Sequence, residues 1–166
     1  RRMRAAVGGA FQHDPRENRA RKPDLRCEIL EDCRVPPAGL VSIIIPFKDQ
    51  LGLLRNCLHS IWRSSYRNFE VILMDNGSAE PRMLCYLDHL RTRRRIRIIA
   101  RPEPFNFPRL CNQGAAAARG DWLLFLNNDT ETLTADWMER MLEVAGHPRI
   151  GVVGATLLHA DGTLQH

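Results

Sequence analysis

The residues best suited to chemistry follow a short apolar run. Trp122 to Leu126 include no polar residue, and Asn127, Asn128 and Asp129 come directly after them. A carboxylate flanked by amide side chains supplies the hard oxygen ligands that Mg²⁺ and Mn²⁺ prefer. An Asx-rich turn that ends a strand and caps the next helix explains the same residues equally well. The motif by itself leaves both interpretations open.

Polar residues also follow two other apolar runs. Residues 46–49 come after the run 41–45, and residues 75–78 come after the run 69–74. We predict that both runs, like 122–126, are strands buried on both faces of a sheet. Because ligands of open α/β sheets bind at the carboxyl ends of the strands, we expect the three polar clusters to converge on one crevice.

Amphipathic patterns separate these runs. Apolar residues at helical spacing predict four helices, over 50–64, from the residues after 78 to about 92, over 108–118, and over 134–145. We expect Asp49 to cap the first of these helices and Thr134 to cap the last, because their side-chain oxygens can accept the N–H groups of a first turn.

Further β-branched stretches complete the predicted fold. Residues 96–100 and 150–154 are expected to be strands, and 157–164 to start a hairpin around Asp161-Gly162. Strands that alternate with helices indicate βαβ units. The sequence therefore predicts an α/β fold with a mainly parallel, Rossmann-like sheet and flanking helices.

The composition narrows the classes of function. The net charge is +5, and only Lys22 and Lys48 are lysines, so arginine carries nearly all the positive charge. Aromatic residues are few and do not interleave with the arginines, which argues against nucleic acid as a partner. We interpret the Arg-rich run 91–95 as a solvated face in preference to a membrane or polyanion patch. Five cysteines without a C-x-x-C pair favour a reducing compartment over a zinc or disulfide site.

The chain divides into two parts. Residues 1–38 carry many Arg, Pro and acidic residues with little periodicity, and we predict a linker or upstream tail there, followed by one domain over 39–166. We expect the sequence to be a piece of a longer protein. The glycine spacings of dinucleotide and P-loop sites are absent, as are the signatures of ester and peptide hydrolysis.

Four motifs in a fixed order resemble family 2 glycosyltransferases with the GT-A nucleotide-diphospho-sugar fold. They are the residues 41–46, 71–78, 105–107 leading to 112–114, and 123–131. The last residues, 161–166, are typical of the branch that makes bacterial surface polysaccharides, which includes rhamnosyltransferases. The resemblance covers about three quarters of the chain and implies that the C-terminal part of the fold is missing.

The resemblance assigns nucleotide-binding roles residue by residue. Asp75 corresponds to the aspartate that binds a uracil or thymine base, and Pro46 and Phe47 correspond to the loop beside that base. Asn112 and nearby Arg109 correspond to the helix start that lines the nucleotide pocket. These assignments imply a nucleotide-diphospho-sugar donor as the ligand.

Residues 127–129 correspond to the D-x-D motif of this family. Asp129 matches the carboxylate that binds the divalent cation, Mn²⁺ or Mg²⁺, and Asn127 is the expected second ligand of that metal. Asn128 is expected near the ribose. The motif has Asp where this chain has Asn127, so one fewer negatively charged ligand would surround the cation.

The implied activity is inverting transfer of the sugar to a glycan or lipid-linked acceptor. The general base that deprotonates the acceptor would lie beyond His166, so this chain would be the donor-binding half and inactive alone. A hypothesis from another class is a non-catalytic nucleotide-binding module with a degenerate D-x-D motif. We expect a cytoplasmic protein, with peripheral contact at the inner face of the membrane as an open alternative.

Overall fold

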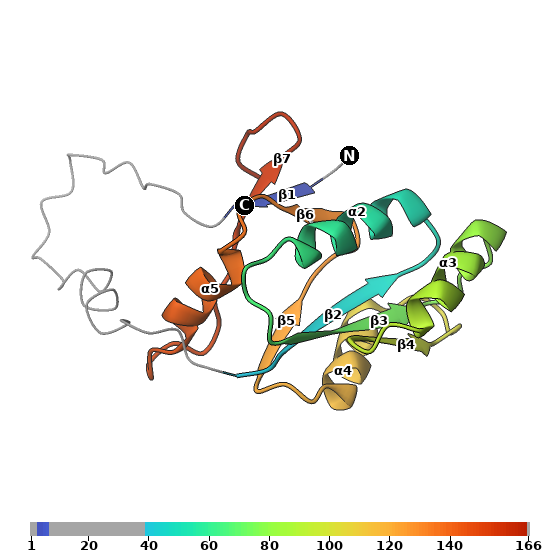
Figure 1. The fold of residues 1–166 in the computed structure, drawn as a ribbon, viewed down its shortest axis with the longest axis horizontal. Helices are drawn as coiled ribbons and strands as arrows, with labels where there is room; N and C mark the ends of the chain where they lie inside the picture. Colours follow the sequence, from blue (N-terminus) through green and yellow to red (C-terminus); the bar gives the residue numbers. More distant parts are fainter. Residues whose placement is uncertain (1–2, 7–38, 166) are drawn as a thin grey trace, which may run out of the picture.

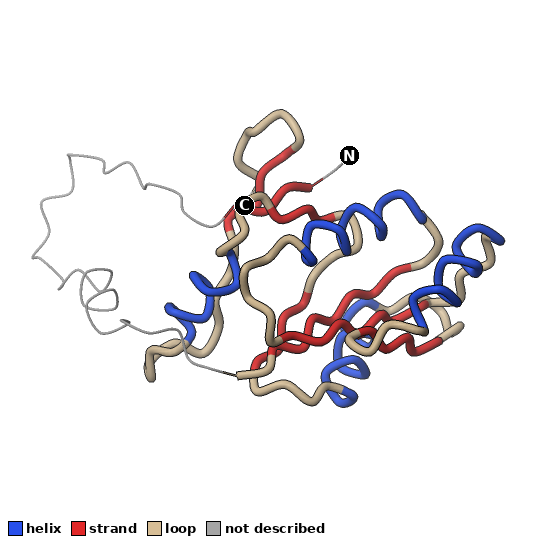
Figure 2. The backbone as a smooth tube through the Cα atoms, in the orientation of Figure 1, coloured by secondary structure: helices blue, strands red, loops and turns tan. Residues whose placement is uncertain are grey.

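The computed structural model describes residues 3–6 and 39–165. Figures 1 and 2 show a central sheet with helices on both sides. Its four strands are parallel and lie in the order β4-β3-β2-β5, with bounds β2 Val41–Phe47, β3 Phe69–Asp75, β4 Ile96–Ala100 and β5 Trp122–Phe125. The predicted α/β fold with a mainly parallel sheet is confirmed.

β2 and β3 form the buried middle of this sheet. Every residue of β2 is buried, and only Glu70 of β3 is partly exposed. Successive side chains of a strand point to opposite faces, so a strand covered on both sides needs apolar residues throughout. In β2, Ile43 and Ile45 pack into one hydrophobic cluster and Ile44 into another. The β-branched run therefore matches its place in the sheet.

Three helices cover the two faces. α2 (Leu51–Trp62) and α3 (Pro81–Arg91) lie on one face of the sheet, and α4 (Phe107–Ala117) lies on the other (Figure 1). All three match the predicted helices to within two residues. None of the helices in the described ranges is long and apolar enough to cross a membrane.

The strand order reverses between β2 and β5. The chain proceeds from β2 to β3 and β4 on one side, then returns to place β5 on the other side of β2. The connection that leaves β2 leads to α2, and the one that leaves β5 leads to β6 (Thr130–Thr132) and α5 (Trp137–Ala145), which pack on the same face of the sheet as α2. The residues that follow β2 and β5 therefore lie next to each other at the carboxyl edge of the sheet, where ligands of open α/β sheets bind.

β5 is less buried than its sequence suggested. It lies at an edge of the four-stranded sheet, and Leu123 and Phe125 are each 48% exposed. Only Trp122 and Leu124, on the opposite face, pack against the core together with the following Leu126. The prediction of burial on both faces was wrong because the neighbouring elements, and not the apolar run itself, decide which faces are covered.

A second, smaller sheet has the order β6-β1-β7, from β6 (Thr130–Thr132), β1 (Met3–Ala6) and β7 (Thr156–His159). β7 leads through a turn at Gly162 (φ 86°) to Leu164, which pairs with Leu158. The hairpin around Asp161-Gly162 is therefore confirmed. Apart from β1, the predicted linker 1–38 lies outside the described residues, and its boundary stays a prediction.

Three local predictions were wrong. Residues 150–154 form no strand, because within the described ranges no neighbouring strand shares hydrogen bonds with them. Thr134 does not cap a helix, since α5 (Trp137–Ala145) begins after Asp136. Asp49 does not cap α2, whose N-cap is Gln50 without a side-chain hydrogen bond.

Candidate functional site

The carboxyl ends of β2, β3 and β5 bring the predicted site residues to one edge of the sheet. Phe47 lies opposite Asp75 in the β2–β3 register. On the other side of β2, Phe125 lies opposite Ile44, and continuing this register places Asn127 at the level of Pro46. The end of β2 therefore lies between Asp75 and the 127–129 segment.

Pro46 and Phe47 occupy a different environment from the one expected. They are the last two residues of β2 and not part of a loop, and both are buried. Phe47 packs in the hydrophobic core, and the chain leaves the sheet only at Lys48. The expected loop placement was wrong because the strand extends two residues past the β-branched run. A contact of these residues with a base stays a prediction.

Asp75 begins a tight turn at the end of β3. It is 7% exposed, and its Oδ1 accepts the Ser78 N–H at 2.8 Å. Among residues 3–6 and 39–165, its Oδ2 has no hydrogen-bond partner. Gly77 adopts φ 76°, and a Cβ there would lie 3.2 Å from the Cβ of Pro102. The turn thus requires glycine and holds one carboxylate oxygen, leaving the other for a ligand.

Asn76 connects this turn to the segment that precedes α4. Its Nδ2 donates to the carbonyls of Arg101 (2.7 Å) and Glu103 (2.8 Å). The Glu103 carboxylate forms a salt bridge of 3.0 Å with Arg109, whose N–H is capped by Asn106 Oδ1 at 3.0 Å. Arg109 therefore belongs to the same group of contacts as the Asp75 turn, with its charge balanced by Glu103.

Two other polar residues of the α4 region differ in position. Asn112 lies one turn after Arg109 and is exposed, so its amide is available to a ligand. Arg119 follows α4, and its N–H donates to Oε1 of Glu70 near the start of β3. Arg119 therefore lies at the opposite edge of the sheet from the candidate site.

Residues 127–130 form a compact turn after β5. The Thr130 N–H donates to the Asn127 carbonyl at 3.2 Å, while Leu126 is held to the Ile44 carbonyl at 3.0 Å. Asn127 is exposed, whereas Thr130 is buried and begins β6. The turn interpretation of this motif is thus correct for the turn itself but wrong for the helix cap, because the next element is the strand β6; a role in cation binding stays open.

The 127–130 turn also packs against α2. Cys57 Sγ lies 3.6 Å from the Asn127 carbonyl. Burial raises the pKa of the Cys57 thiol to about 12, and the nearby Asp129 and Glu131 carboxylates add to the rise. Both carboxylates therefore lie near the buried face of α2.

The residues present fit a cation that the protein holds by few ligands. Asp129 Oδ1 is buried and has no hydrogen-bond partner among the described residues. In the part of the chain that the structure describes, no group of three or more His, Cys, Asp or Glu side chains could hold a metal ion. Mg²⁺ is commonly bound by one or two carboxylates together with substrate phosphates. The donor set suits that mode and not a closed protein cage.

Sequence reasoning missed the contacts of Asp49. Its Oδ1 accepts the N–H groups of Ala79 and Glu80, both at 2.9 Å, and its own N–H donates to Ser78 Oγ at 2.8 Å. These donors hold the pKa of Asp49 below its ordinary value of 3.8, the Glu80 N–H having the larger effect. The capping tendency of Asp was visible in the sequence. Its actual partners were not, because the Ala79 and Glu80 N–H groups lie on another loop, just before α3.

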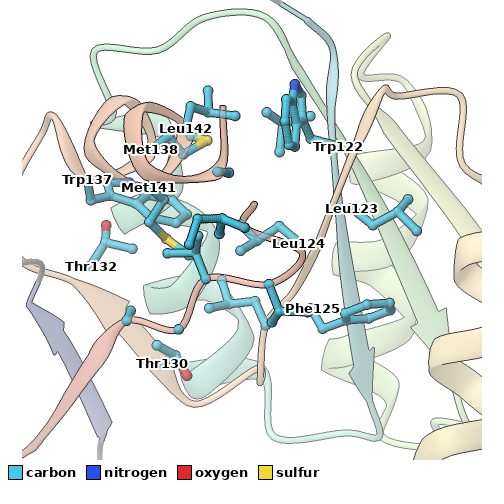
Figure 3. Close-up of a pocket in the computed structure, with 18 of the residues that line it drawn as sticks. Trp122, Leu123, Leu124, Phe125, Thr130, Thr132, Trp137, Met138, Met141 and Leu142 are labelled. Carbon is cyan, nitrogen blue, oxygen red and sulfur yellow. The ribbon is translucent and has the colours of Figure 1, made fainter. Parts of the chain in front are cut away.

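An apolar cavity of about 730 Å³ separates β5 from α5 (Figure 3). Figure 3 shows Leu124 on its β5 side and Met138, Met141 and Leu142 of α5 across from it. Residues 150–155 also line it. Its apolar lining does not suit a diphosphate, so we place the candidate site at the polar strand ends.

The chain is similar to known proteins in sequence. A family model described as Glycosyl transferase family 2 matches residues 42–165. Protein y4gI of Sinorhizobium fredii is 41% identical over 129 residues, which are 76% of this chain and 14% of that protein. O-antigen biosynthesis protein RfbC of Myxococcus xanthus is 35% identical over 166 residues, 98% of this chain and 13% of that protein. The chain thus spans about a seventh of the length of these relatives.

Solved structures agree in fold. The mannosyltransferase PcManGT from Pyrobaculum calidifontis, in complex with GDP-Man and Mn²⁺, superposes with a TM-score of 0.62 at 16% identity, covering 76% of this chain and 40% of that one. TarS 1–349 of S. aureus gives 0.52 at 18% identity, covering 60% and 30% of the two chains. Both are similar in fold.

Proposed function

Because the chain belongs to glycosyl transferase family 2, we propose that it binds a nucleotide-diphospho-sugar and forms the donor-binding part of an inverting transferase. The observation that carries this proposal is the placement of Asp75 and the 127–129 turn on the two sides of the end of β2. Two acidic positions there match the two ends of such a donor, its base and its diphosphate.

We assign the base to Asp75. Its Oδ1 is used by the Ser78 N–H, and its Oδ2 is left to accept the imide N–H of uracil or thymine. Pro46 and Phe47 end the neighbouring strand and form the floor beside the base. Arg109 and Asn112 line the pocket from α4, with the Arg109 guanidinium shared between Glu103 and the donor phosphates.

We assign the diphosphate and its cation to the 127–129 turn. Asp129 holds the divalent cation, Asn127 contributes an amide oxygen, and Asn128 contacts the ribose. Mn²⁺ or Mg²⁺ at this position would neutralise the charge that grows on the departing diphosphate. The Mn²⁺ in the PcManGT complex is a precedent from a protein of similar fold.

The acceptor and the general base belong to the whole protein. We propose a glycan or lipid-linked acceptor, in keeping with the O-antigen biosynthesis role that the name of RfbC states. Asp161 does not serve as the base in this proposal, since its Oδ1 accepts from both the N–H and the Oγ1 of Thr163. The carboxylate that deprotonates the acceptor is expected outside residues 1–166. The proposed location is the cytoplasm, with or without contact with the inner face of the membrane.

Calorimetric titration tests the donor site. UDP and dTDP should bind the chain of residues 1–166, more tightly with Mn²⁺ than without it, and GDP should bind more weakly. Removing a hydrogen bond to a charged group loses about 1.5–3 kcal/mol, so Asp75→Ala should weaken UDP binding about 10–100-fold with or without Mn²⁺.

Two further variants separate the base from the diphosphate. Asp129→Ala should abolish the gain from Mn²⁺ and leave metal-free binding unchanged, whereas Asn127→Asp should increase the gain. If a chain shown to be folded by circular dichroism binds neither UDP nor dTDP, the donor-site proposal is wrong.

A further inference from the structure

A second loop is attached to the turn that carries Asp75. Asp49, in the loop between β2 and α2, contacts Ser78, Ala79 and Glu80 through the hydrogen bonds given above, and we refer to these as the Asp49 contacts. Ser78 is the residue whose N–H binds Asp75 Oδ1. Ser78 therefore receives a restraint from each side, one from Asp49 and one from Asp75.

The backbone around Asp49 is unusual. Asp49 and Gln50 have φ angles of 49° and 58°, and among the described residues they are the only non-glycine positions with positive φ. This conformation is strained for residues other than glycine, and it persists only where the surrounding structure fixes it. Asp tolerates this conformation better than most residues. The observed loop conformation directs the Asp49 carboxylate to the start of α3 and away from α2.

The Asp49 contacts join the two loops that border the end of β2. The adjacent strands are also joined there, since the Asn76 N–H donates to the Phe47 carbonyl at 2.9 Å. Beyond this last ladder bond, the Asp49 contacts are the only hydrogen bonds among the described residues that join the loop after β2 to the turn after β3. A carboxylate that accepts two backbone N–H groups makes charge-assisted bonds, which are stronger than neutral ones.

We propose that Asp49 is a positioning residue that holds the 75–78 turn in the conformation in which Asp75 Oδ2 binds the nucleotide base. Asp49 acts through its carboxylate on the Ala79 and Glu80 N–H groups, which follow the turn directly, and through its own N–H on Ser78; it has no contact with the ligand. The inference rests on the proposed function, since it assigns Asp49 to the base-binding part of the same site. It predicts that nucleotide affinity depends on Asp49 only while Asp75 is present.

Two substitutions at Asp49 form a matched pair. In Asp49→Asn the amide oxygen can still accept both N–H groups, so the turn should stay in place. In Asp49→Gly the acceptor is lost, while glycine adopts φ 49° without strain, so the change isolates the side chain from the backbone. The pair therefore compares presence and absence of the acceptor at one backbone conformation.

The expected effect follows from the population of the competent turn. If loss of the Asp49 contacts leaves the turn competent about a tenth of the time, the apparent Kd for UDP rises roughly tenfold. We therefore expect Asp49→Gly to weaken metal-free UDP binding about tenfold and Asp49→Asn to stay close to the wild-type affinity. Ser78→Ala, which removes the acceptor of the Asp49 N–H, should lie between them.

A double-mutant cycle separates positioning from general loosening. In an Asp75→Ala background, Asp49→Gly should cause no further loss of UDP affinity, because its effect passes through Asp75. An equal loss in both backgrounds would show that Asp49 acts elsewhere. Equal affinity of the wild type, Asp49→Asn and Asp49→Gly would overturn the proposal outright.

Amide hydrogen exchange provides a measurement that needs no nucleotide. The N–H groups of Ala79 and Glu80 should exchange faster in Asp49→Gly than in Asp49→Asn, because only the glycine variant lacks the acceptor. Unchanged exchange would show that Asp49 does not hold the turn. Absence of UDP binding by the wild type would instead refute the donor site, so the two failures are distinguishable.

Discussion

Gly114 fixes the distance between α4 and the sheet. A Cβ at this position would lie 2.5 Å from Ile44 Cγ2, and 3.4 Å from Met74 Cγ and Ile44 Cγ1. Carbon atoms in contact are ordinarily about 3.5–4.0 Å apart. Ile44 is fully buried and β-branched, so its methyl group has no alternative rotamer with free space. Gly114→Ala should therefore force α4 away from β2 by about 1 Å.

Two opposing effects determine the magnitude. Overpacking a core costs about 1–3 kcal/mol, whereas replacing glycine by alanine inside a helix gains about 1 kcal/mol. Because the contact would be about 1 Å too short, we expect a cost at the upper end of this range, about 2–3 kcal/mol, and so a net loss of about 1–2 kcal/mol in the free energy of unfolding. For a chain of this length, such a loss lowers Tm by about 2–8 °C.

Gly52 provides the matched control. It lies in α2, is exposed, and a Cβ there would have no atom within 4 Å. Gly52→Ala should therefore stabilise the chain by about 0.5–1 kcal/mol. Urea unfolding followed by circular dichroism measures both variants, and an unchanged m-value would show that the denatured state is not the cause. If Gly114→Ala is as stable as the wild type or more stable, the close packing of α4 on β2 is refuted.

Three further predictions concern buried or charged groups. The Cys57 thiol is buried and its pKa is raised to about 12, so it should resist iodoacetamide at pH 8 in the folded chain, whereas the exposed Cys85 should react. Peptide mass spectrometry measures the labelling of each cysteine, and equal labelling of the two would contradict the prediction. The Thr132 N–H donates to Ser60 Oγ at 3.0 Å, and Ser60→Ala removes this acceptor. The free energy of unfolding in urea should fall by about 1–3 kcal/mol. A loss below about 0.5 kcal/mol would indicate that water replaces the bond. The pKa of Asp49 is lowered in the folded chain, so the ionised carboxylate stabilises the fold above the unfolded pKa, near 3.8, and this contribution disappears as the pH falls through the folded pKa. The difference in the free energy of unfolding between the wild type and Asp49→Asn should therefore change only below about pH 4. A change in this difference near neutral pH would refute the assignment.

Much of the fold could be predicted from local patterns. Continuous apolar runs and period-3.6 repeats of apolar residues located β2, β3, β4 and the three crossover helices to within two residues, because burial inside a sheet or against a helix layer imposes these patterns. The same patterns failed at residues 150–154. Strand formation there requires a neighbouring strand, and a local pattern contains no information about neighbours.

The candidate site divides in the same way. The residue types at 75 and 127–129, and their positions directly after apolar runs, were sufficient to predict polar groups at one edge of a parallel sheet. The sequence did not show that β5 lies at an edge, that Phe47 belongs to the core, or that Arg109 is paired with Glu103. Each of these depends on contacts between residues that are distant in the chain or on the packing of whole elements.

The sequence by itself determined which carboxylate and amide side chains follow the apolar runs, and so which groups are available to accept an N–H or to bind a cation. Only the tertiary structure decided how those side chains are oriented. Asp49 shows the physical reason, since an aspartate that follows a strand can cap any helix whose N–H groups come within reach. The packing of two loops beside β2, and no local preference, directs its carboxylate to the Ala79 and Glu80 N–H groups, between α3 and the turn that carries Asp75.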